Sequence, residues 1–190
     1  AVRCAVTSQK KNALGGWRYG PESTDADTSV TGAVLMGLLA ARNAGIEVPD
    51  ECIDKALAYF KRVTGRTGSV GYTMGHGGAS PNRTAIAALV YSIGKRKETD
   101  EFKWVAERVK GSGSGNNDNH KHYFRYYSAQ ALFQADFDAW KNWNSEVIRA
   151  IAKEQEKDGS FQSGYGQAYG TAMSLLTIAL NYRFLPIYER

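Results

Sequence analysis

The sequence predicts an all-α protein in which an inner layer of helices is wrapped by an outer layer. Three observations predict this architecture: a repeated helical segment, an alternation of two helix types, and a recurring turn between them. The repeated segment is apolar and begins with a hydroxyl residue followed by Ala or Gly, at Thr31, Thr84, Ser128 and Thr171. These anchor residues lie 53, 44 and 43 residues apart, a spacing typical of stacked supersecondary units.

The helices predicted between the anchored segments are amphipathic. Over Asp50–Thr64, apolar side chains such as Ile53 and Leu57 recur at helical spacing, and charged residues fill the remaining surface. This pattern is typical of a helix with one face in water. The same pattern predicts outer helices over residues 145–156 and, more weakly, 98–110.

The anchored segments are apolar on nearly every face, as over residues 33–41 and 171–180. A helix of this kind is normally enclosed by other helices. We therefore expect the following residues to be buried in one concentric inner layer: Thr31, Leu35, Thr84, Leu89, Ala129, Leu132, Thr171 and Leu175.

Helix starts and turns agree with this arrangement. Ser80 precedes Pro81, so a hydroxyl cap stands before a proline at the first helical position. Asp25 and Asp27 lie where their charges favour the positive N-terminus of the next helix. The turns into inner helices combine glycine with an aromatic residue, over 15–20, 68–72 and 159–161. Glycine turns the chain, and the aromatic side chain fills the junction.

Composition excludes several classes of protein. The 24 Lys and Arg residues are scattered among 19 Asp and Glu residues, so the net charge of +5 does not form a basic block for nucleic acid. Cys4 and Cys52 are too few for a disulfide framework and lack the spacing of a zinc site. No apolar run approaches the ~20 residues that span a membrane. Residue 1 falls within the pattern of a helix, so we expect this chain to be the C-terminal part of a longer one.

One motif resembles a known superfamily. Residues 155–161, Gln-Glu-Lys-Asp-Gly-Ser-Phe, resemble the Gln-x-x-x-Gly-x-Trp/Phe repeat of squalene–hopene cyclases and protein prenyltransferase β subunits, and Gln9 with Gly15–Trp17 is a looser copy. The closing residues 182–190 look like the end of bacterial relatives of these proteins. The resemblance implies that residues 1–190 form a single α/α-toroid repeat domain, an incomplete barrel, with its chemistry at the N-terminal ends of the inner helices.

The acid motif of class II terpene cyclases is not intact. That motif, Asp-x-Asp-Asp-Thr-Ala, supplies a carboxylic acid that protonates an alkene. With Thr31 as its threonine, the three Asp positions become Asp27, Ser29 and Val30, so the proton donor is missing. If the motif is instead aligned to start at Asp25, Asp27 takes the position of the proton donor. This alignment does not match the register of the repeats, however. Asp25 and Asp27 are therefore weak catalytic candidates, and a role at a helix terminus is the alternative.

The zinc site of protein prenyltransferases is also broken. The resemblance implies an Asp-x-Cys pair before one inner helix and a His before the threonine of another. Here Ser29 replaces the thiolate, and Gly170 precedes Thr171. His120 and His122 with Asp118 are a second candidate metal set, for which a solvated loop is the alternative interpretation. We predict no metal and no cofactor.

The superfamily resemblance also implies a ligand site. His76 lies in a glycine-rich turn just before Arg83, where a cation and close backbone approach suit an anionic group such as a diphosphate. Aromatic residues suited to an isoprenoid chain are Tyr72, Tyr127, Tyr165 and Tyr169, together with Tyr123, Tyr126 and Phe161. A structural turn and packing at the repeat junctions are the alternatives.

Two functions follow from these observations. The first, implied by the resemblance, is a prenyltransferase-like or squalene cyclase-like repeat protein that binds an isoprenoid or another apolar small molecule at the end of the inner helices. The second is a non-catalytic α/α-toroid scaffold that binds a protein partner. The broken catalytic motifs favour the second function, and the resemblance favours the first.

Overall fold

The computed structural model describes residues 1–75, 77–113 and 120–182, and all regular elements within these ranges are helices. The all-α prediction is therefore confirmed. The helices are α1 (Val2–Lys10), α2 (Thr28–Asn43), α3 (Asp50–Val63), α4 (Pro81–Ile93), α5 (Asp100–Lys110), α6 (Lys121–Ala135), α7 (Phe137–Glu154) and α8 (Gln167–Ala179). No helix in the described ranges is long and apolar enough to cross a bilayer.

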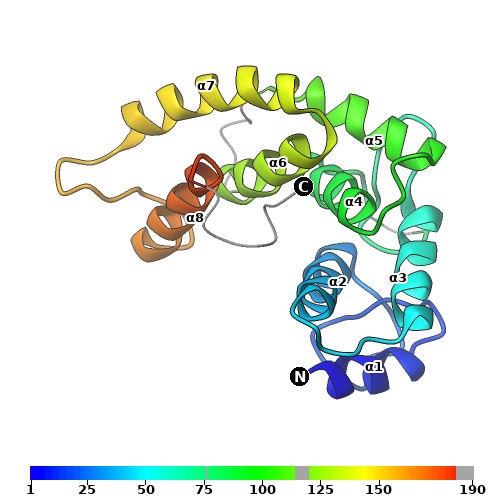
Figure 1. The fold of residues 1–190 in the computed structure, drawn as a ribbon. Helices are drawn as coiled ribbons and strands as arrows, with labels where there is room; N and C mark the ends of the chain where they lie inside the picture. The colour runs from blue at the N-terminus through cyan, green and yellow to red at the C-terminus, as the bar shows by residue number, and fades with distance from the viewer. Residues whose placement is uncertain (76, 114–119, 183–190) are drawn as a thin grey trace.

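The helices alternate between two positions along a curved array. The even-numbered helices form a continuous series, because α4 packs against both α2 and α6, and α6 packs against α8. Figure 1 shows α3, α5 and α7 along the outer side of this arc, with α2, α4, α6 and α8 inside it. The outer helices carry the strongly amphipathic sequences, and the inner helices carry the anchored repeats.

Burial of the inner layer was predicted correctly at six of eight positions. Leu35, Leu89 and Leu132 are fully buried, as are Thr31, Thr84 and Ala129. The prediction is wrong for Leu175, which is 55% exposed, and Thr171 is only partly buried. The reason is position: α8 lies at the end of the inner series, so its side away from α6 has no inner helix to cover it in the described part of the chain.

The anchor hydroxyls attach the glycine–aromatic turns to the inner helices. Thr171 Oγ1 accepts a hydrogen bond from the Phe161 N–H at 3.0 Å, and Thr84 Oγ1 donates to the Gly68 carbonyl at 3.2 Å. Phe161 is buried beneath its turn. The third copy differs, since Ser128 Oγ is buried with no hydrogen-bond partner among the described residues. The repeated hydroxyl thus stabilises the junction between a turn and its helix.

Two helices begin earlier than their apolar pattern indicates. α7 starts at Phe137 rather than near residue 145, because the Asp136 side chain caps it by accepting a hydrogen bond from the Ala139 N–H at 3.0 Å. α6 starts at Lys121, which places His122 in its first turn. His76 and Asp118 lie outside the described residues, as do residues 183–190.

Candidate functional site

A cleft of about 470 Å³ lies at the N-terminal ends of the four even-numbered helices. Its walls come from the turns before α2, α4 and α8 and from the first turns of these helices and of α6. The lining residues are Tyr19, Asp27, Ser29, Tyr72, Ser80, Asn82, Arg83, His120, Tyr123, Tyr165 and Tyr169. Seven residues that the sequence singled out as candidates for a site or as helix-terminal charges therefore lie together here, namely Asp27, Tyr72, Arg83, His120, Tyr123, Tyr165 and Tyr169.

Tyr72 lies between two guanidinium groups. The Cζ atoms of Arg18 and Arg83 each lie 5.5 Å from the centre of its ring, and Arg18 Nη2 donates to the Tyr72 hydroxyl at 3.3 Å. A hydrogen bond with Asp27, with a smaller contribution from burial, raises the pKa of Tyr72. Cation–π contacts of this kind hold both arginines over one ring. Tyr72 therefore contacts both Arg83, which lines the cleft, and Arg18, which lies outside the lining and pairs with Asp25.

The guanidinium group of Arg83 donates hydrogen bonds to two backbone carbonyl groups. Its Nε donates to the Val70 carbonyl at 3.4 Å, and its Nη2 donates to the carbonyl of Gly78. Partial burial lowers the pKa of the guanidinium, although Asp27 and Tyr72 oppose that shift. An arginine retains its charge through shifts of this kind because its ordinary pKa lies so far above neutral pH.

Asp27 and Asp25 have contacts that favour structural roles. Asp27 is 1% exposed and caps α2, with its Oδ1 accepting hydrogen bonds from the N–H groups of Ser29 at 2.6 Å and Val30 at 3.2 Å. Asp25 is exposed and forms an ion pair with Arg18 at 2.7 Å. The carboxylate that faces the cleft thus serves as a helix cap.

Tyrosine and histidine rings form one wall of the cleft. Tyr165 contacts His120 with ring centres 5.5 Å apart and Tyr169 with ring centres 5.4 Å apart. Burial raises the pKa of Tyr123 and of Tyr169, so these phenols stay neutral hydrogen-bond donors at physiological pH. The wall therefore offers apolar ring faces with polar edges.

Some sequence candidates belong to the core instead. Tyr127 is buried behind the cleft, where its ring centre lies 4.7 Å from that of Tyr123, and burial strongly raises its pKa. Phe161 fills a repeat junction. Neither residue lines the cleft. The sequence places Tyr127 on an inner-helix segment and Phe161 in the turn before one, but it does not separate a ring at the surface of the cleft from one behind it.

The solvated-loop interpretation of the His-x-His pair is wrong for His122. His122 is buried in α6, where its Nε2 lies 3.1 Å from the Gln162 carbonyl oxygen and its Nδ1 lies 3.2 Å from Ser174 Oγ. Burial lowers its pKa. His120 instead faces the cleft. No group of three or more His, Cys, Asp or Glu side chains in the described ranges is placed to hold a metal ion.

Sequence reasoning missed three residues of the cleft. Tyr19 is exposed at the end of the first glycine–aromatic turn, and Ser80 and Asn82 flank the start of α4. Tyr19 and Asn82 are one or two residues from a position that the sequence did single out. Ser80 was predicted only as a hydroxyl cap of α4, and that prediction is wrong, because its side chain makes no capping hydrogen bond. Proximity to the start of an inner helix was the available signal, because that is where the cleft lies.

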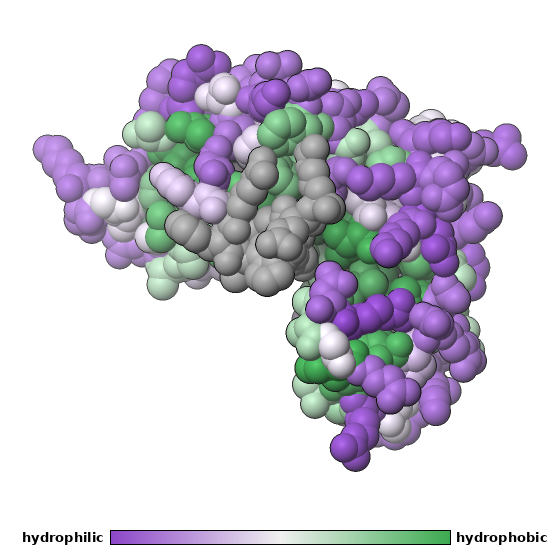
Figure 2. Space-filling view, in the orientation of Figure 1, coloured by the Kyte–Doolittle hydropathy of each residue, from purple (hydrophilic) through white to green (hydrophobic). Residues whose placement is uncertain are grey.

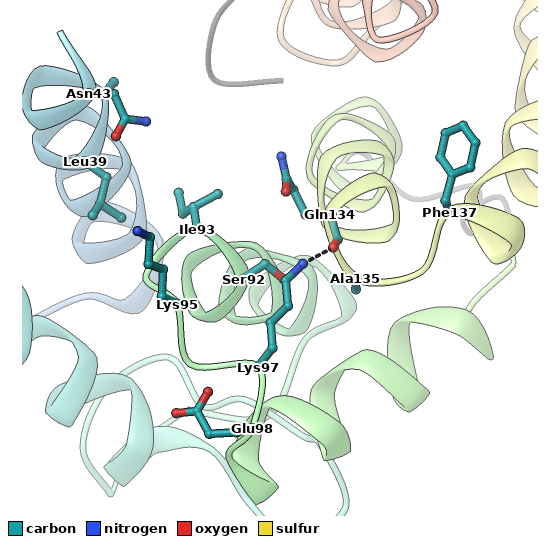
Figure 3. Close-up of a pocket in the computed structure, with 11 residues that line it drawn as sticks. Leu39, Asn43, Ser92, Ile93, Lys95, Lys97, Glu98, Gln134, Ala135 and Phe137 are labelled. Atoms are coloured by element: carbon teal, nitrogen blue, oxygen red, sulfur yellow. Dashed lines mark hydrogen bonds between the residues drawn. The ribbon is translucent and has the colours of Figure 1, made fainter. Parts of the chain in front are cut away.

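A second cleft, of about 720 Å³, lies at the opposite ends of α2, α4 and α6. Figure 3 shows Lys97 of the α4–α5 turn reaching the backbone of α6, where its ammonium group donates to the carbonyl oxygen of Gln134. Three helix C-termini meet here, and their partial negative charges attract lysines such as Lys95 and Lys97. Charge compensation at helix ends accounts for these lysines, so the cleft with Arg83 is the stronger candidate site.

Comparisons with known proteins gave no relative for this chain. No protein-family model, no curated protein and no solved structure matches it.

Proposed function

We propose that this chain is an incomplete α/α toroid related to terpenoid cyclases and protein prenyltransferases, and that it binds an isoprenoid diphosphate or a similar amphiphile without transforming it. The observation that carries the proposal is the convergence of Arg83 and a tyrosine wall at the N-terminal ends of α2, α4, α6 and α8. The repeat motifs of the sequence support the family relationship.

The two halves of such a ligand match the two halves of the cleft. A diphosphate suits Arg83 and the partial positive charges of several helix N-termini at one end of the array. The faces of Tyr165 and Tyr169 suit an unsaturated hydrocarbon chain, which packs against aromatic rings. The tyrosine hydroxyl groups leave water and polar groups access to the cleft, so the ligand remains partly in solvent.

The contacts of Asp27 favour binding over catalysis. Alkene protonation needs a carboxylic acid that holds its proton in an apolar cavity. Asp27 Oδ1 already accepts hydrogen bonds from the N–H groups of Ser29 and Val30, and the side chain lies beside Arg83 and Tyr72 rather than among apolar side chains alone. We therefore assign it to the structure of the cleft rather than to proton transfer.

Calorimetric titration with farnesyl diphosphate tests the proposal. We expect saturable binding, and we expect Arg83→Gln to weaken it about tenfold or more, since a charge-assisted contact is lost. Melting temperature is measured in parallel because Arg83 also contacts the Val70 carbonyl. Arg149→Gln is the matched control, because it removes one positive charge from an exposed position of α7 outside the cleft. No heat and no melting shift at about 1 mM ligand would reject the proposal.

A protein-interaction scaffold is the second candidate function. The observation that favours it is the exposed apolar side of α8, which includes Leu175 and Leu176. Exposed apolar surface of this kind is typical of sites that bind another protein. A null titration together with specific self-association or partner binding through α8 would favour the scaffold.

A further inference from the structure

The His122 side chain joins three parts of the chain that are distant in sequence. It lies in the first turn of α6 and is only 2% exposed. Its Nε2 contacts the carbonyl oxygen of Gln162, in the turn before α8, and its Nδ1 contacts the hydroxyl oxygen of Ser174, in α8. A carbonyl oxygen can only accept a hydrogen bond, so we assign the ring proton to Nε2 and the acceptor role to Nδ1. The neutral form of His122 therefore satisfies both contacts.

α8 and the turn before it are attached to each other. The Phe161 N–H of the turn donates to Thr171 Oγ1 of the helix at 3.0 Å, and a Cβ atom on Gly170 would lie 2.5 Å from the Phe161 carbonyl oxygen. The turn thus packs directly on the helix, and we call residues 155–179 the α8 unit. Tyr165 and Tyr169 of the cleft both belong to it. A movement of the α8 unit therefore changes the wall of the cleft.

The α8 unit is covered mainly on one side. Its principal helix neighbour is α6, whereas α4 and α6 each pack between two inner helices. Leu175 and Leu176 are exposed on the far side of α8, and Figure 2 shows hydrophobic residues at the surface in this region. An element with few covering contacts opens locally at a lower free energy than the core does. The loss of one buried contact should therefore affect α8 more than α4.

The surroundings of His122 disfavour a positive charge on its ring. Burial is the largest effect that lowers the pKa of His122, and the charges of Lys121 and Arg125 on α6 lower it further. The hydrogen bond with the Gln162 carbonyl and the carboxylate of Glu154 on α7 act in the opposite direction but do not outweigh these effects. The closed structure therefore favours the neutral ring.

The α8 unit supplies no charge that would compensate a protonated ring. Residues 167–179 include no charged side chain, and burial raises the pKa of Tyr169, which stays neutral. The charged residues of the turn, at 156–158, are exposed to solvent. Protonation would also place a hydrogen on Nδ1, where the Ser174 hydroxyl group now donates. A proton on His122 thus opposes the contact with α8.

We propose that His122 is a pH-sensitive switch, which holds the α8 unit against α6 while its ring is neutral and releases the unit when the ring is protonated in mild acid. Because the pKa is lowered in the closed form, the contribution to stability is complete above the ordinary pKa of 6.5 and is lost as the pH falls toward the lowered value. Release moves Tyr165 and Tyr169 out of the cleft wall. The switch does not depend on the ligand proposed above.

Hydrogen exchange of the backbone amides in the whole chain, without ligand, tests the switch. Exchange is compared at about pH 7.5 and about pH 5, on either side of the ordinary histidine pKa. After correction for the intrinsic effect of pH, we expect the protection of α8 to fall at least about threefold in acid while that of α4 is unchanged. The ion pairs of Glu154 persist in this range, because its pKa is about 2.

Two histidine variants assign the response to one ring. His122→Gln can still donate to the Gln162 carbonyl but takes up no proton, so its α8 protection should be the same at both pH values. His120→Gln is the matched control, because it removes the histidine that faces the cleft and leaves His122 in place. It should respond to acid like the wild type.

Ser174→Ala gives a second test that keeps the titrating ring. It removes the hydrogen bond to Nδ1, so α8 protection should already be at least about threefold lower at neutral pH. Equal α8 protection of the wild type at both pH values, an equal fall in α4, an acid response retained by His122→Gln, or unchanged protection in Ser174→Ala would each overturn the proposal.

Discussion

The hydroxyl oxygen of Thr31 accepts a hydrogen bond from the backbone N–H of Trp17 at 2.9 Å and donates one to the carbonyl oxygen of the same residue at 3.2 Å. Close approach is possible because the preceding residue is Gly16, where a Cβ atom would lie 2.6 Å from Thr31 Oγ1. Trp17 is buried, and its indole N–H donates to the Ala5 carbonyl at 2.8 Å. One hydroxyl therefore connects the first glycine–aromatic turn to α2.

Replacement of that hydroxyl should destabilise the fold. Thr31→Val preserves shape but leaves the buried Trp17 N–H without its partner, whereas the Trp17 carbonyl still accepts from the Asp27 N–H, so we expect a loss of about 1–3 kcal/mol in the free energy of unfolding. Ser128→Ala is the matched comparison, because Ser128 Oγ has no partner among the described residues. Its effect should stay within about 0.5 kcal/mol. Urea denaturation of both variants measures the difference; equal losses would contradict the role given to Thr31.

Leucine truncation should have opposite outcomes at the two ends of the inner layer. Leu35 is fully buried in α2, so Leu35→Ala should cost about 2–5 kcal/mol through lost packing and a cavity. Leu175 occupies a corresponding place in its repeat but is 55% exposed, so Leu175→Ala should cost less than about 1 kcal/mol in the monomer. Denaturation at low protein concentration separates this effect from self-association. A large loss at Leu175 would show that the face is covered within the monomer.

Stability should fall in acid through Glu154. Burial raises the pKa of this carboxyl, but hydrogen bonds and the charges of Arg125 and Lys121 outweigh it and lower the pKa from 4.5 to about 2. Both guanidinium N–H contacts with Arg125 are 2.9 Å long. A lowered carboxyl pKa means that the stabilisation is complete above pH 4.5 and is lost as the pH falls toward 2.

Comparison of two variants isolates this contribution. Glu154→Gln should lower stability at pH 7 by at least about 1 kcal/mol, because the buried Arg125 loses its charged partner. It should also flatten the dependence of unfolding free energy on pH below 4.5. Asp138→Asn, which removes an exposed carboxylate, should leave that slope nearly unchanged. Identical slopes for Glu154→Gln and the wild type would contradict the assignment.

The protein should not hold stoichiometric zinc at Asp27. The carboxylate oxygen Oδ1 already accepts hydrogen bonds from Ser29 and Val30, and Gly170, in the first turn of α8, provides no side chain. Elemental analysis after purification without an affinity tag measures bound zinc. One tightly bound zinc ion that is lost in Asp27→Ala would overturn both the repeat register and the cap assignment. Without zinc, that variant should still lose about 0.5–2 kcal/mol of stability through the missing helix cap.

The sequence by itself determined the helices, their two types and the end of the array at which the candidate residues gather. Helical spacing of Ile53 and Leu57 predicted α3 as an amphipathic helix, and the anchor at Thr31 predicted α2 as a largely buried one. Arg83 and Tyr169 each lie at the start of an anchored helix, and both line the cleft at that end. These features depend on the spacing of residues along the chain, which can be read directly from the sequence.

Only the tertiary structure decided which faces and rings are covered. The pattern of α8 indicates an enclosed helix, but Leu175 is exposed because coverage requires a neighbour on its far side. His122 belongs to a polar pattern, yet it is buried because α8 and the Gln162 carbonyl lie against it. Periodicity identifies the apolar face of a helix, whereas burial depends on elements that are distant in sequence, and those contacts form only when the whole array packs.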